Sequence, residues 1–155
     1  MEHSIETISR GVFVNGRKEI LLCKNRAGNF YYLPGGHIEW GESGVGALMR
    51  EFKEEMGIAL EIPVSNIGVM EHYFVDRDNA VHHELNIIYT GRLDGGSIVS
   101  VENDITFEWI PFAEASEKLI YPRALLSAVL DRVTSDVDEH KPFFISEGFI
   151  NSNSK

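Results

Sequence analysis

The amino-acid sequence predicts an α/β/α sandwich, in which helices cover both faces of a mixed β-sheet. Strand-like and helix-like segments alternate along the chain without an internal repeat, and this alternation is typical of layered α/β domains. The chain has 155 residues, of which 43% are hydrophobic, so it can bury one core of good size. We therefore expect a single compact domain.

The first part of the chain predicts a hairpin and then a short strand. Residues 7–16 and 19–24 have the composition of two strands, and Asn15-Gly16 at the end of the first segment favours a turn with positive φ. The aromatic segment 30–33 predicts a further strand. The run from Pro34 to Gly36 should end that strand in a tight backbone turn.

Residues 43–56 predict an amphipathic helix. Its apolar stripe consists of Val45, Leu48, Met49, Phe52 and Met56, at spacings typical of one helical face. Ser43 is placed to cap the start, although Gly46 stands where a capping box has Glu or Gln. Gly57 follows the last turn and is expected to cap it in the left-handed conformation.

The second half of the chain predicts three more strands and two helices. The strands are expected over residues 67–75, 83–93 and 107–110, and the helices over residues 111–119 and 122–133. The C-terminal segment is extended and apolar in patches. We expect four of its side chains to pack on this subunit or on a second copy, namely Phe143, Phe144, Phe149 and Ile150.

The chain is acidic and has a single cysteine. Its 24 acidic and 14 basic residues give a formal net charge of -10, which disfavours a surface that tracks long nucleic acids. Cys23 follows three apolar residues and is expected to be buried, and one cysteine forms neither an internal disulfide nor a thiolate cluster. No apolar run approaches the roughly 18 residues of a membrane span. We therefore expect a cytoplasmic protein without a membrane partner.

Three glutamates crowd the predicted helix. Glu51, Glu54 and Glu55 stand at i, i+3 and i+4, so their side chains share one face beside the apolar stripe. Like charges one turn apart cost only about 0.2–0.5 kcal/mol when they are exposed, so a solvated acidic face also explains the crowding. The i, i+4 spacing of Arg50 and Glu54 is compatible with that simpler explanation.

The spacing around these glutamates resembles the Nudix box over residues 36–58. Every fixed position of that pattern is matched, by Gly36, Glu42, Arg50, Glu51, Phe52, Glu54, Glu55, Gly57 and Ile58. The segments 31–36 (YYLPGG) and 108–115 (EWIPFAEA) are similar to flanking segments of the same family, so the resemblance spans most of residues 5–133. It implies a Nudix-like domain over residues 1–140 and a C-terminal tail, residues 141–155, outside the resemblance.

The resemblance implies a hydrolase that depends on Mg²⁺ or Mn²⁺ and cleaves a diphosphate bond in a small nucleoside diphosphate-linked or related substrate. An acidic protein needs such hard cations to hold a pyrophosphate, and oxygen ligands are those that Mg²⁺ prefers. Carried over to this chain, the metal ligands are Glu51, Glu55, Glu54 and the carbonyl of Gly36, and the catalytic residues are Glu54, Glu51 and Arg50. Arg50 and Glu42 are also expected to have a structural role, in which Arg50 forms an ion pair that fixes the carboxylates and the loop.

Residues outside the box are weaker candidates. Substrate binding is considered for Lys24, Arg26, Glu84 and Glu102, but surface acids and solvated loop cations explain them equally well. Tyr31, Tyr73 and Phe74 could stack on a nucleobase, yet alternating aromatic residues in strands belong more often to the core. His82 and His83 are adjacent on a strand and point to opposite faces, so they do not readily share one metal ion.

Three functions from different classes stay open at this point. We favour a catalytic pyrophosphohydrolase, because a protein that only binds has little reason to keep every acidic position of the box. The alternatives are a non-catalytic ligand sensor on the same scaffold and an interaction protein whose acidic helix and apolar tail dock partners. The expected partner of the hydrolase is a small-molecule phosphoanhydride. The sequence leaves open which substrate this is and whether the protein forms a homodimer.

Overall fold

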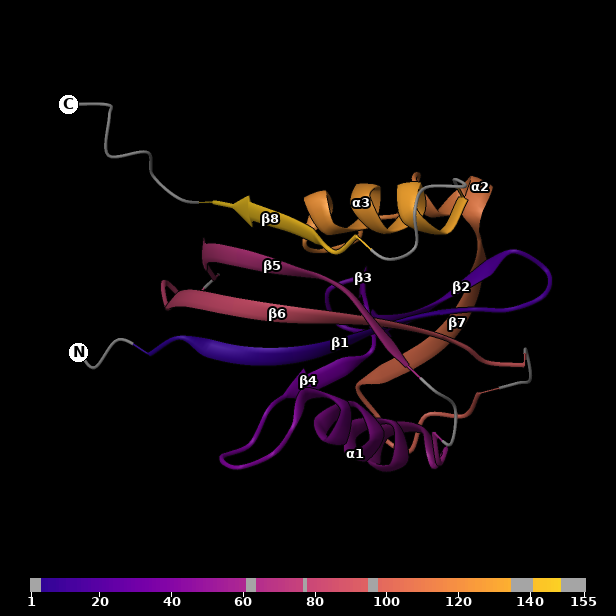
Figure 1. Cartoon of the computed structure of the whole chain (residues 1–155), viewed down its shortest axis with the longest axis horizontal. Coiled ribbons are helices and arrows are strands. Elements are labelled where there is room, and N and C mark those ends of the chain that lie inside the picture. Colours follow the sequence, from indigo (N-terminus) through magenta and orange to yellow (C-terminus); the bar gives the residue numbers. More distant parts are fainter. Residues whose placement is uncertain (1–3, 61–63, 77, 95–97, 135–140, 149–155) are drawn as a thin grey trace.

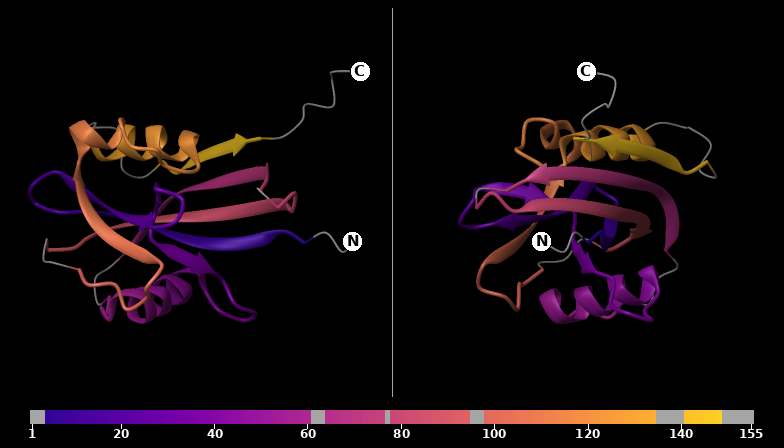
Figure 2. Two further views of the ribbon diagram at one scale, coloured as in Figure 1. Left: turned by 180° about the vertical axis from the view of Figure 1, so that it is seen from behind. Right: turned by 90° about the vertical axis from the view of Figure 1, so that its left-hand side faces the viewer.

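The computed structural model describes residues 4–60, 64–76, 78–94, 98–134 and 141–148. The elements follow the order β1 (Glu6–Val14), β2 (Glu19–Asn25), β3 (Phe30–Tyr32), β4 (Gly35–His37), α1 (Gly44–Met56), β5 (Ser65–Val75), β6 (Val81–Arg92), β7 (Ile105–Pro111), α2 (Phe112–Ala115), α3 (Arg123–Thr134) and β8 (Phe143–Glu147). Helix α1 lies on one side of the sheet, and α2 and α3 lie on the other (Figures 1 and 2). The predicted α/β/α sandwich is therefore confirmed. None of the described helices is long and apolar enough to cross a membrane.

Strand β1 organises the sheet. Within the described residues eight strands form one sheet, in the order β3, β2, β1, β6, β5 and β8, while β4 pairs with β1 and β7 pairs with β2. β1 runs parallel to β6 from Glu6 to Val14. Its other edge is divided, because residues 8–10 pair with β4, whereas the pairing with β2 is made at Val14, opposite Ile20. The strands β2, β3 and β7 therefore diverge from the N-terminal part of β1.

The core has two halves, one on each face of the sheet. Leu22 of β2 packs in the cluster that contains Leu125 of α3. Its neighbour Cys23 points to the opposite face and packs in the cluster that contains Phe52 of α1. Because successive strand residues face opposite sides, a strand buried on both faces reads as a continuous apolar run, as residues 20–23 do. Cys23 is fully buried, as predicted.

Helix α1 begins and ends as predicted. The Ser43 hydroxyl accepts a hydrogen bond from the Gly46 amide at 3.0 Å, and Gly57 ends the helix with a φ of 66°. The buried side chains are Ala47, Leu48, Phe52, Glu55 and Met56. Met49 is 45% exposed, so its assignment to the apolar stripe was wrong. The helix packs through positions 48 and 52, and this face includes position 55, so Glu55 lies on the buried side rather than beside it.

The turn between β1 and β2 differs in detail from the predicted one. The positive φ of 60° belongs to Lys18 rather than to Asn15 or Gly16. The Asn15 side chain instead accepts hydrogen bonds from the backbone amides of Arg17 and Glu19, at 2.9 and 3.2 Å. A four-residue turn closed by the Asn15 side chain therefore replaces the expected two-residue turn.

The elements after residue 104 also differ in length from those predicted. Strand β7 begins at Ile105, earlier than expected, because it pairs with β2 along its whole length. The helix predicted over residues 111–119 was too long, since α2 ends at Ala115. The following chain turns back to β3, where the Tyr31 amide donates a 2.8 Å hydrogen bond to the Leu119 carbonyl.

The C-terminal segment contributes a strand to the same sheet. β8 pairs in parallel with β5, from Gly68 opposite Phe143 to His72 opposite Glu147. A Cβ at position 68 would collide with the Phe143 ring, so the glycine gives β8 the space to approach. The sheet thus extends beyond the region that resembles a known family.

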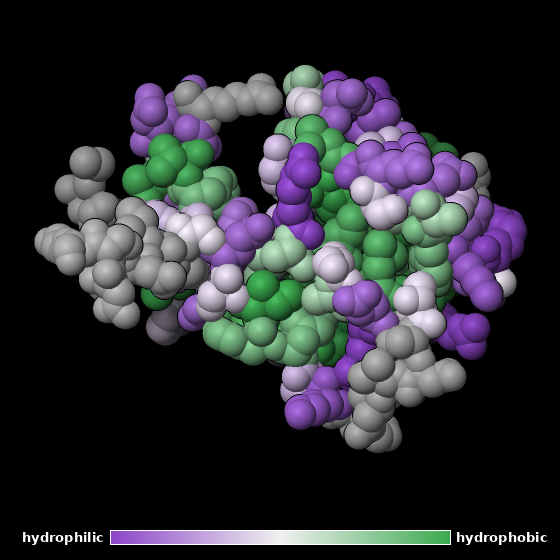
Figure 3. All heavy atoms as spheres, turned by 90° about the horizontal axis from the view of Figure 1, so that it is seen from above, coloured by the Kyte–Doolittle hydropathy of each residue, from purple (hydrophilic) through white to green (hydrophobic). Residues whose placement is uncertain are grey.

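The side chains of β8 alternate between the core and solvent. Phe143 and Ile145 pack against the cluster beneath α3, whereas Phe144 is 67% exposed. Phe149 and Ile150 of the predicted apolar tail lie outside the described residues. On the face that carries α3 and β8, hydrophobic side chains are interrupted by polar ones (Figure 3).

We predict that Phe143→Ala lowers the free energy of unfolding by about 2 kcal/mol, because it removes a ring from the junction of β5, β8 and α3. Phe144→Ala, one position along the same strand, should change it by less than about 0.5 kcal/mol, because that ring faces solvent. Urea unfolding of both variants measures the difference. Equal effects would contradict the docking of β8 through Phe143.

Candidate functional site

Arg50 is the centre of a hydrogen-bond network in the motif. Its guanidinium donates two hydrogen bonds to the Glu42 carboxylate, at 3.1 and 3.0 Å, in the fork geometry that favours arginine. Nη1 also donates to Glu51 at 2.8 Å and to Glu54 at 3.2 Å, and Nη2 donates to the His37 carbonyl at 2.9 Å. These hydrogen bonds raise the pKa of Arg50, and the bonds to Glu42 contribute most to the shift. Arg50 therefore ties helix α1 to the loop that follows β4.

Glu51 lies directly against the backbone of β4. A Cβ at Gly36 would collide with the Glu51 carboxylate, so this close approach requires glycine. Gly36 is held in place by its pairing with Ser9 of β1. The Ser9 hydroxyl in turn donates a 2.7 Å hydrogen bond to the Gly44 carbonyl, at the start of α1. Sheet, loop and helix are thus fixed to one another around Glu51.

Glu55 is a buried carboxylate that lacks a hydrogen bond. It is 9% exposed, and its Oε2 has no hydrogen-bond partner among the described residues. Burial, together with the charges of Glu51 and Glu102, raises the pKa of Glu55 to about 7. The segment that carries Glu102 is attached here, because the Val101 amide donates a 2.7 Å hydrogen bond to the Glu55 carbonyl. Burial among like charges is unfavourable for a carboxylate, and the charge of Arg10 offsets this only in part.

Glu51, Glu55 and Gly36 fit a divalent cation better than Glu54 does. The carboxylates of Glu51 and Glu55 are shielded from solvent and interact electrostatically with each other. Oxygen donors such as these are the ligands of Mg²⁺ and Mn²⁺. The Glu54 side chain is 57% exposed and is paired with Arg50. In the part of the chain that the structure describes, no three His, Cys, Asp or Glu side chains are gathered around one point. Arg50 holds Glu51 and Glu54, so both carboxylates would have to turn in order to face an ion.

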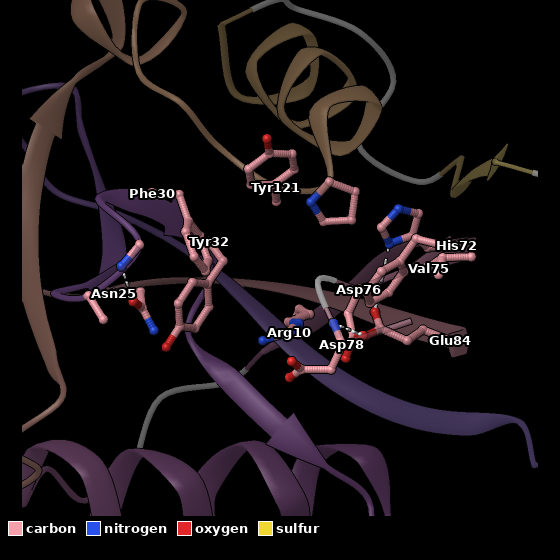
Figure 4. Close-up of a pocket in the computed structure, with 14 residues that line it drawn as sticks. Arg10, Asn25, Phe30, Tyr32, His72, Val75, Asp76, Asp78, Glu84 and Tyr121 are labelled. Carbon is pink, nitrogen blue, oxygen red and sulfur yellow. Dashed lines mark hydrogen bonds and ion pairs between the residues drawn. The ribbon is translucent and has the colours of Figure 1, made fainter. Parts of the chain in front are cut away.

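A cavity of about 960 Å³ lies where β2 and β3 diverge from β1. On one side it is lined by Phe30 and Tyr32 of β3, with Tyr121; on the other side it is lined by His72, Asp76, Asp78 and Glu84 (Figure 4). Phe74 and Pro122 also belong to the lining. Arg10 of β1 lies between the two sides. The lining is aromatic and acidic, with Arg10 as the strong base among its described residues.

Arg10 connects the cavity to the motif. Its Nη1 donates to the carbonyls of Leu33 and Gly35, at 3.2 and 3.4 Å, and its Nε donates to Asn86 Oδ1 at 3.2 Å. Burial lowers the pKa of Arg10, and the charge of Glu84 opposes this shift. Sequence reasoning missed this residue. An arginine in the middle of a strand is the signal that could have found it, because charged side chains are rarely buried without a partner.

The four weaker candidates lie in different places. Glu84 lines the cavity. Burial raises its pKa, but the nearby His72 ring, the hydrogen bond from Asn86 and the charge of Arg10 together lower the pKa below its ordinary value. Glu102 lies near Glu55, as described above. Lys24 and Arg26 are not among the described residues that line the cavity.

Lys24 is engaged in a contact on the α3 side of the sheet. Its ammonium lies 3.6 Å from Glu108 and 5.3 Å from the centre of the Tyr31 ring. Tyr31 is 7% exposed, belongs to the core and donates a 2.9 Å hydrogen bond to Glu108. Tyr31 is therefore a core residue rather than a stacking platform.

Phe74 is the aromatic residue of β5 that reaches the cavity. Its ring stacks on His72 and on His82, with centroid distances of 4.6 and 4.8 Å. His82 also lies 3.0 Å from Glu6 and 3.1 Å from Asp76, which fixes the turn after β5. The rings of Tyr73 and His83 meet edge to face, separately from this stack. His82 and His83 thus have different neighbours, as expected for adjacent strand residues.

Cys23 is unsuited to nucleophilic chemistry. It is fully buried, and desolvation raises the pKa of its thiol to about 12. The thiolate is the reactive form of cysteine, and it is scarce at neutral pH for a thiol with this pKa. Cys23 is therefore not a candidate nucleophile.

We predict that Arg50→Ala lowers the free energy of unfolding by about 2 kcal/mol, because the charged hydrogen bonds to three glutamates and one carbonyl are lost together. Arg50→Lys should restore only part of it, since an ammonium cannot make the forked contact with Glu42. Lys53→Ala, at an exposed position of the same helix, is the control and should stay within about 0.5 kcal/mol of the parent. An unchanged melting temperature of Arg50→Ala would show that the network is not structural.

We predict that the metal-free protein becomes less stable, relative to Glu55→Gln, as the pH rises from 4.5 to about 7. The pKa of Glu55 is raised in the folded chain from its ordinary value of 4.5, so its stabilising contribution is complete below 4.5 and is lost as the pH rises through about 7. Melting temperatures in EDTA across this range measure the difference. A difference between the two proteins that does not change with pH would rule out the raised pKa.

Comparison with known proteins identifies the family. The NUDIX domain model matches residues 6–129. An isopentenyl-diphosphate Delta-isomerase of Jannaschia sp. (strain CCS1) is 26% identical over 117 residues, which are 70% of this chain and 65% of that protein. An RNA pyrophosphohydrolase of Ruthia magnifica subsp. Calyptogena magnifica is 40% identical over 50 residues, which are 32% of this chain and 28% of that protein.

The crystal structure of the MutT protein from Bacillus halodurans has the same fold, with a TM-score of 0.70, 20% identity and coverage of 90% of this chain and 86% of that one. The match thus spans less than two thirds of the isomerase, but the family model covers most of the present sequence, and this chain belongs to the NUDIX domain family.

Proposed function

We propose that this protein is a divalent-metal-dependent pyrophosphohydrolase that cleaves a diphosphate bond in a small nucleoside diphosphate-linked or related substrate. The observation that carries the proposal is the buried, unpartnered carboxylate of Glu55 beside Glu51, which itself lies against Gly36. Without a cation this arrangement is unfavourable, because like charges are held together away from water.

The metal would be held by Glu51, Glu55 and the carbonyl of Gly36, with Glu54 as a further carboxylate at the solvent side. When bound, Mg²⁺ or Mn²⁺ neutralises the diphosphate and activates water as a nucleophile. Glu54 would be the carboxylate available to accept a proton from water, since its side chain is 57% exposed. Arg50 positions Glu51 and Glu54 through its hydrogen bonds.

The cavity would hold the organic part of the substrate. Its described lining carries the acids Asp76, Asp78 and Glu84 against Arg10, so it repels a long phosphate chain and suits an uncharged ring or sugar. Arg10 contacts the Gly35 carbonyl beside the Nudix box, and it would be the cation between the diphosphate and the ring. Lys24 and Arg26 lie outside this lining.

We predict that Mg²⁺ or Mn²⁺ is required for release of phosphate-containing products from at least one member of a substrate panel. The panel consists of nucleoside diphosphate sugars, ADP-ribose, dinucleoside polyphosphates, nucleoside triphosphates and 5′-triphosphate RNA, with isopentenyl diphosphate as the probe for the isomerase alternative. Glu55→Gln should lower turnover by at least about 100-fold while the protein stays folded. Lys53→Gln on the same helix is the matched control and should keep parental turnover.

A thermal-shift measurement, compared with the turnover assay, distinguishes a catalytic protein from one that only binds the metal ion. Millimolar Mg²⁺ should raise the melting temperature more than NaCl of equal ionic strength, because an ion bound to the folded state stabilises it. The combined Glu51→Gln, Glu55→Gln protein should lose this difference. A shift without turnover of any substrate would favour the ligand sensor, and a shift that survives in the double variant would place the ion elsewhere. If the protein isomerises isopentenyl diphosphate and hydrolyses none of the substrates, the proposed reaction is wrong.

A further inference from the structure

Strand β8 brings a carboxylate to the back of the cavity. It lies at residues 143–147, beyond the region 6–129 that the family model matches. Its parallel register on β5 places Glu147 opposite His72, and His72 lines the cavity. Gly68 leaves room for the Phe143 ring in this register, because a Cβ at position 68 would collide with the ring. β8 thus adds a polar group behind a residue of the cavity wall.

A chain of polar groups runs from Glu147 to Arg10. Glu147 Oε2 lies 3.9 Å from His72 Nε2, and His72 Nδ1 lies 3.9 Å from Glu84 Oε2. The same oxygen of Glu84 accepts a 3.1 Å hydrogen bond from Asn86 Nδ2, and Asn86 Oδ1 accepts the 3.2 Å hydrogen bond from Arg10 Nε. Among the described residues these contacts all reach Oε2 of Glu84, which leaves its Oε1 as an acceptor for a bound molecule.

Two atoms in this chain are buried without a hydrogen bond. They are Nδ1 of His72 and Oε2 of Glu147, among the described residues. Buried polar atoms in folded proteins are paired in the great majority of cases, so each of these exceptions calls for an explanation. The contacts of 3.9 Å would become hydrogen bonds if each shortened by about 1 Å. The His72 ring is already oriented, because it stacks on Phe74 at an interplanar angle of 23°.

We infer that Glu147 is a positioning residue of the substrate cavity, which acts through His72 to keep Glu84 turned toward a hydrogen-bond donor of the substrate. This inference rests on the proposed function, because it takes the cavity as the site of the substrate's organic part. His72 closes on Glu147 and Glu84 when the donor reaches Glu84 Oε1. The cavity thereby selects a substrate whose organic part donates hydrogen bonds.

The donor has two chemical sources that the cavity would accept equally. Ring N–H groups, as in guanine, and sugar hydroxyls both donate to a carboxylate. The aromatic side chains Phe30, Tyr32 and Tyr121 suit a flat ring, whereas Asp76 and Asp78 suit hydroxyls. GTP and ADP-ribose, each with Mg²⁺, are therefore the two probes.

The kinetic test compares Glu147→Gln with Ser146→Ala. Ser146 is the matched control. Its hydroxyl donates a hydrogen bond to Glu71 at the same junction of β5 and β8, but the side chain is exposed. For the probe that is hydrolysed, Glu147→Gln should raise KM about fivefold with little change in kcat, the size expected for one weakened hydrogen bond. Ser146→Ala should leave KM unchanged. An equal KM in both variants would overturn the inference.

A double-mutant cycle shows whether Glu147 acts through Glu84. Glu84→Gln should raise KM by itself, and Glu147→Gln should add little in that background, because the group that it positions is already lost. Additive effects of the two substitutions would mean that Glu147 acts on something other than Glu84, and the inference would fail even though the proposed hydrolysis stands.

A spectroscopic test decides the case in which neither probe is hydrolysed. Nitrogen–proton spectra of the histidine rings, recorded on the substrate-free protein, report the contacts of His72 directly. Glu147→Gln and Glu84→Gln should each shift the His72 ring signals clearly, and Ser146→Ala should not. If the ring signals move no more in Glu147→Gln than in Ser146→Ala, the positioning role is wrong. If the expected shifts occur but neither GTP nor ADP-ribose is hydrolysed, the result contradicts only the proposed hydrolysis of these two probes.

Discussion

The division of one edge of β1 is the constraint on which the rest of the structure depends. On this edge residues 8–10 pair with β4 and Val14 pairs with β2, while the other edge of β1 pairs with β6 along the whole strand. The first pairing places Gly36 where the Glu51 carboxylate can reach it. The second lets β2 and β3 diverge, which opens the cavity over Arg10. A single strand therefore sets both the position of the motif and the space beside it.

Two arginines organise the charges around this strand in different ways. Arg50 lies on the helix and binds three glutamates, but among the described residues Oε2 of Glu55 has no hydrogen-bond partner. Arg10 is buried in the sheet and contacts backbone carbonyls and Asn86 instead. The acids thus outnumber the cations that can reach them, and the imbalance is held in place by packing rather than relieved by solvent. A site of this kind gains stability when a cation enters it.

Local features of the fold could be predicted from the sequence, whereas features set by distant pairing could not. The ends of α1 follow from Ser43 and Gly57, because caps depend on neighbouring backbone groups. The ion pairs of Arg50 follow from the spacing of the box. The burial of Glu55, however, depends on which face of α1 meets the sheet, and periodicity alone placed Met49 there instead. Similarly, the meeting of His72 and Glu147 depends on a parallel pairing between segments far apart in the chain, for which a single sequence carries no signal.

The inert state of Cys23 has a practical consequence for solution work. Since this thiol is enclosed by the α1 half of the core and its pKa is about 12, thiol-directed reagents will not modify the folded protein at this position. The chain has no second cysteine. A cysteine introduced at exposed Met49 would therefore be the single reactive thiol, and a dye or spin label attached there would sit on helix α1, one residue from Arg50. Movements of the motif helix could then be followed without first replacing a native residue.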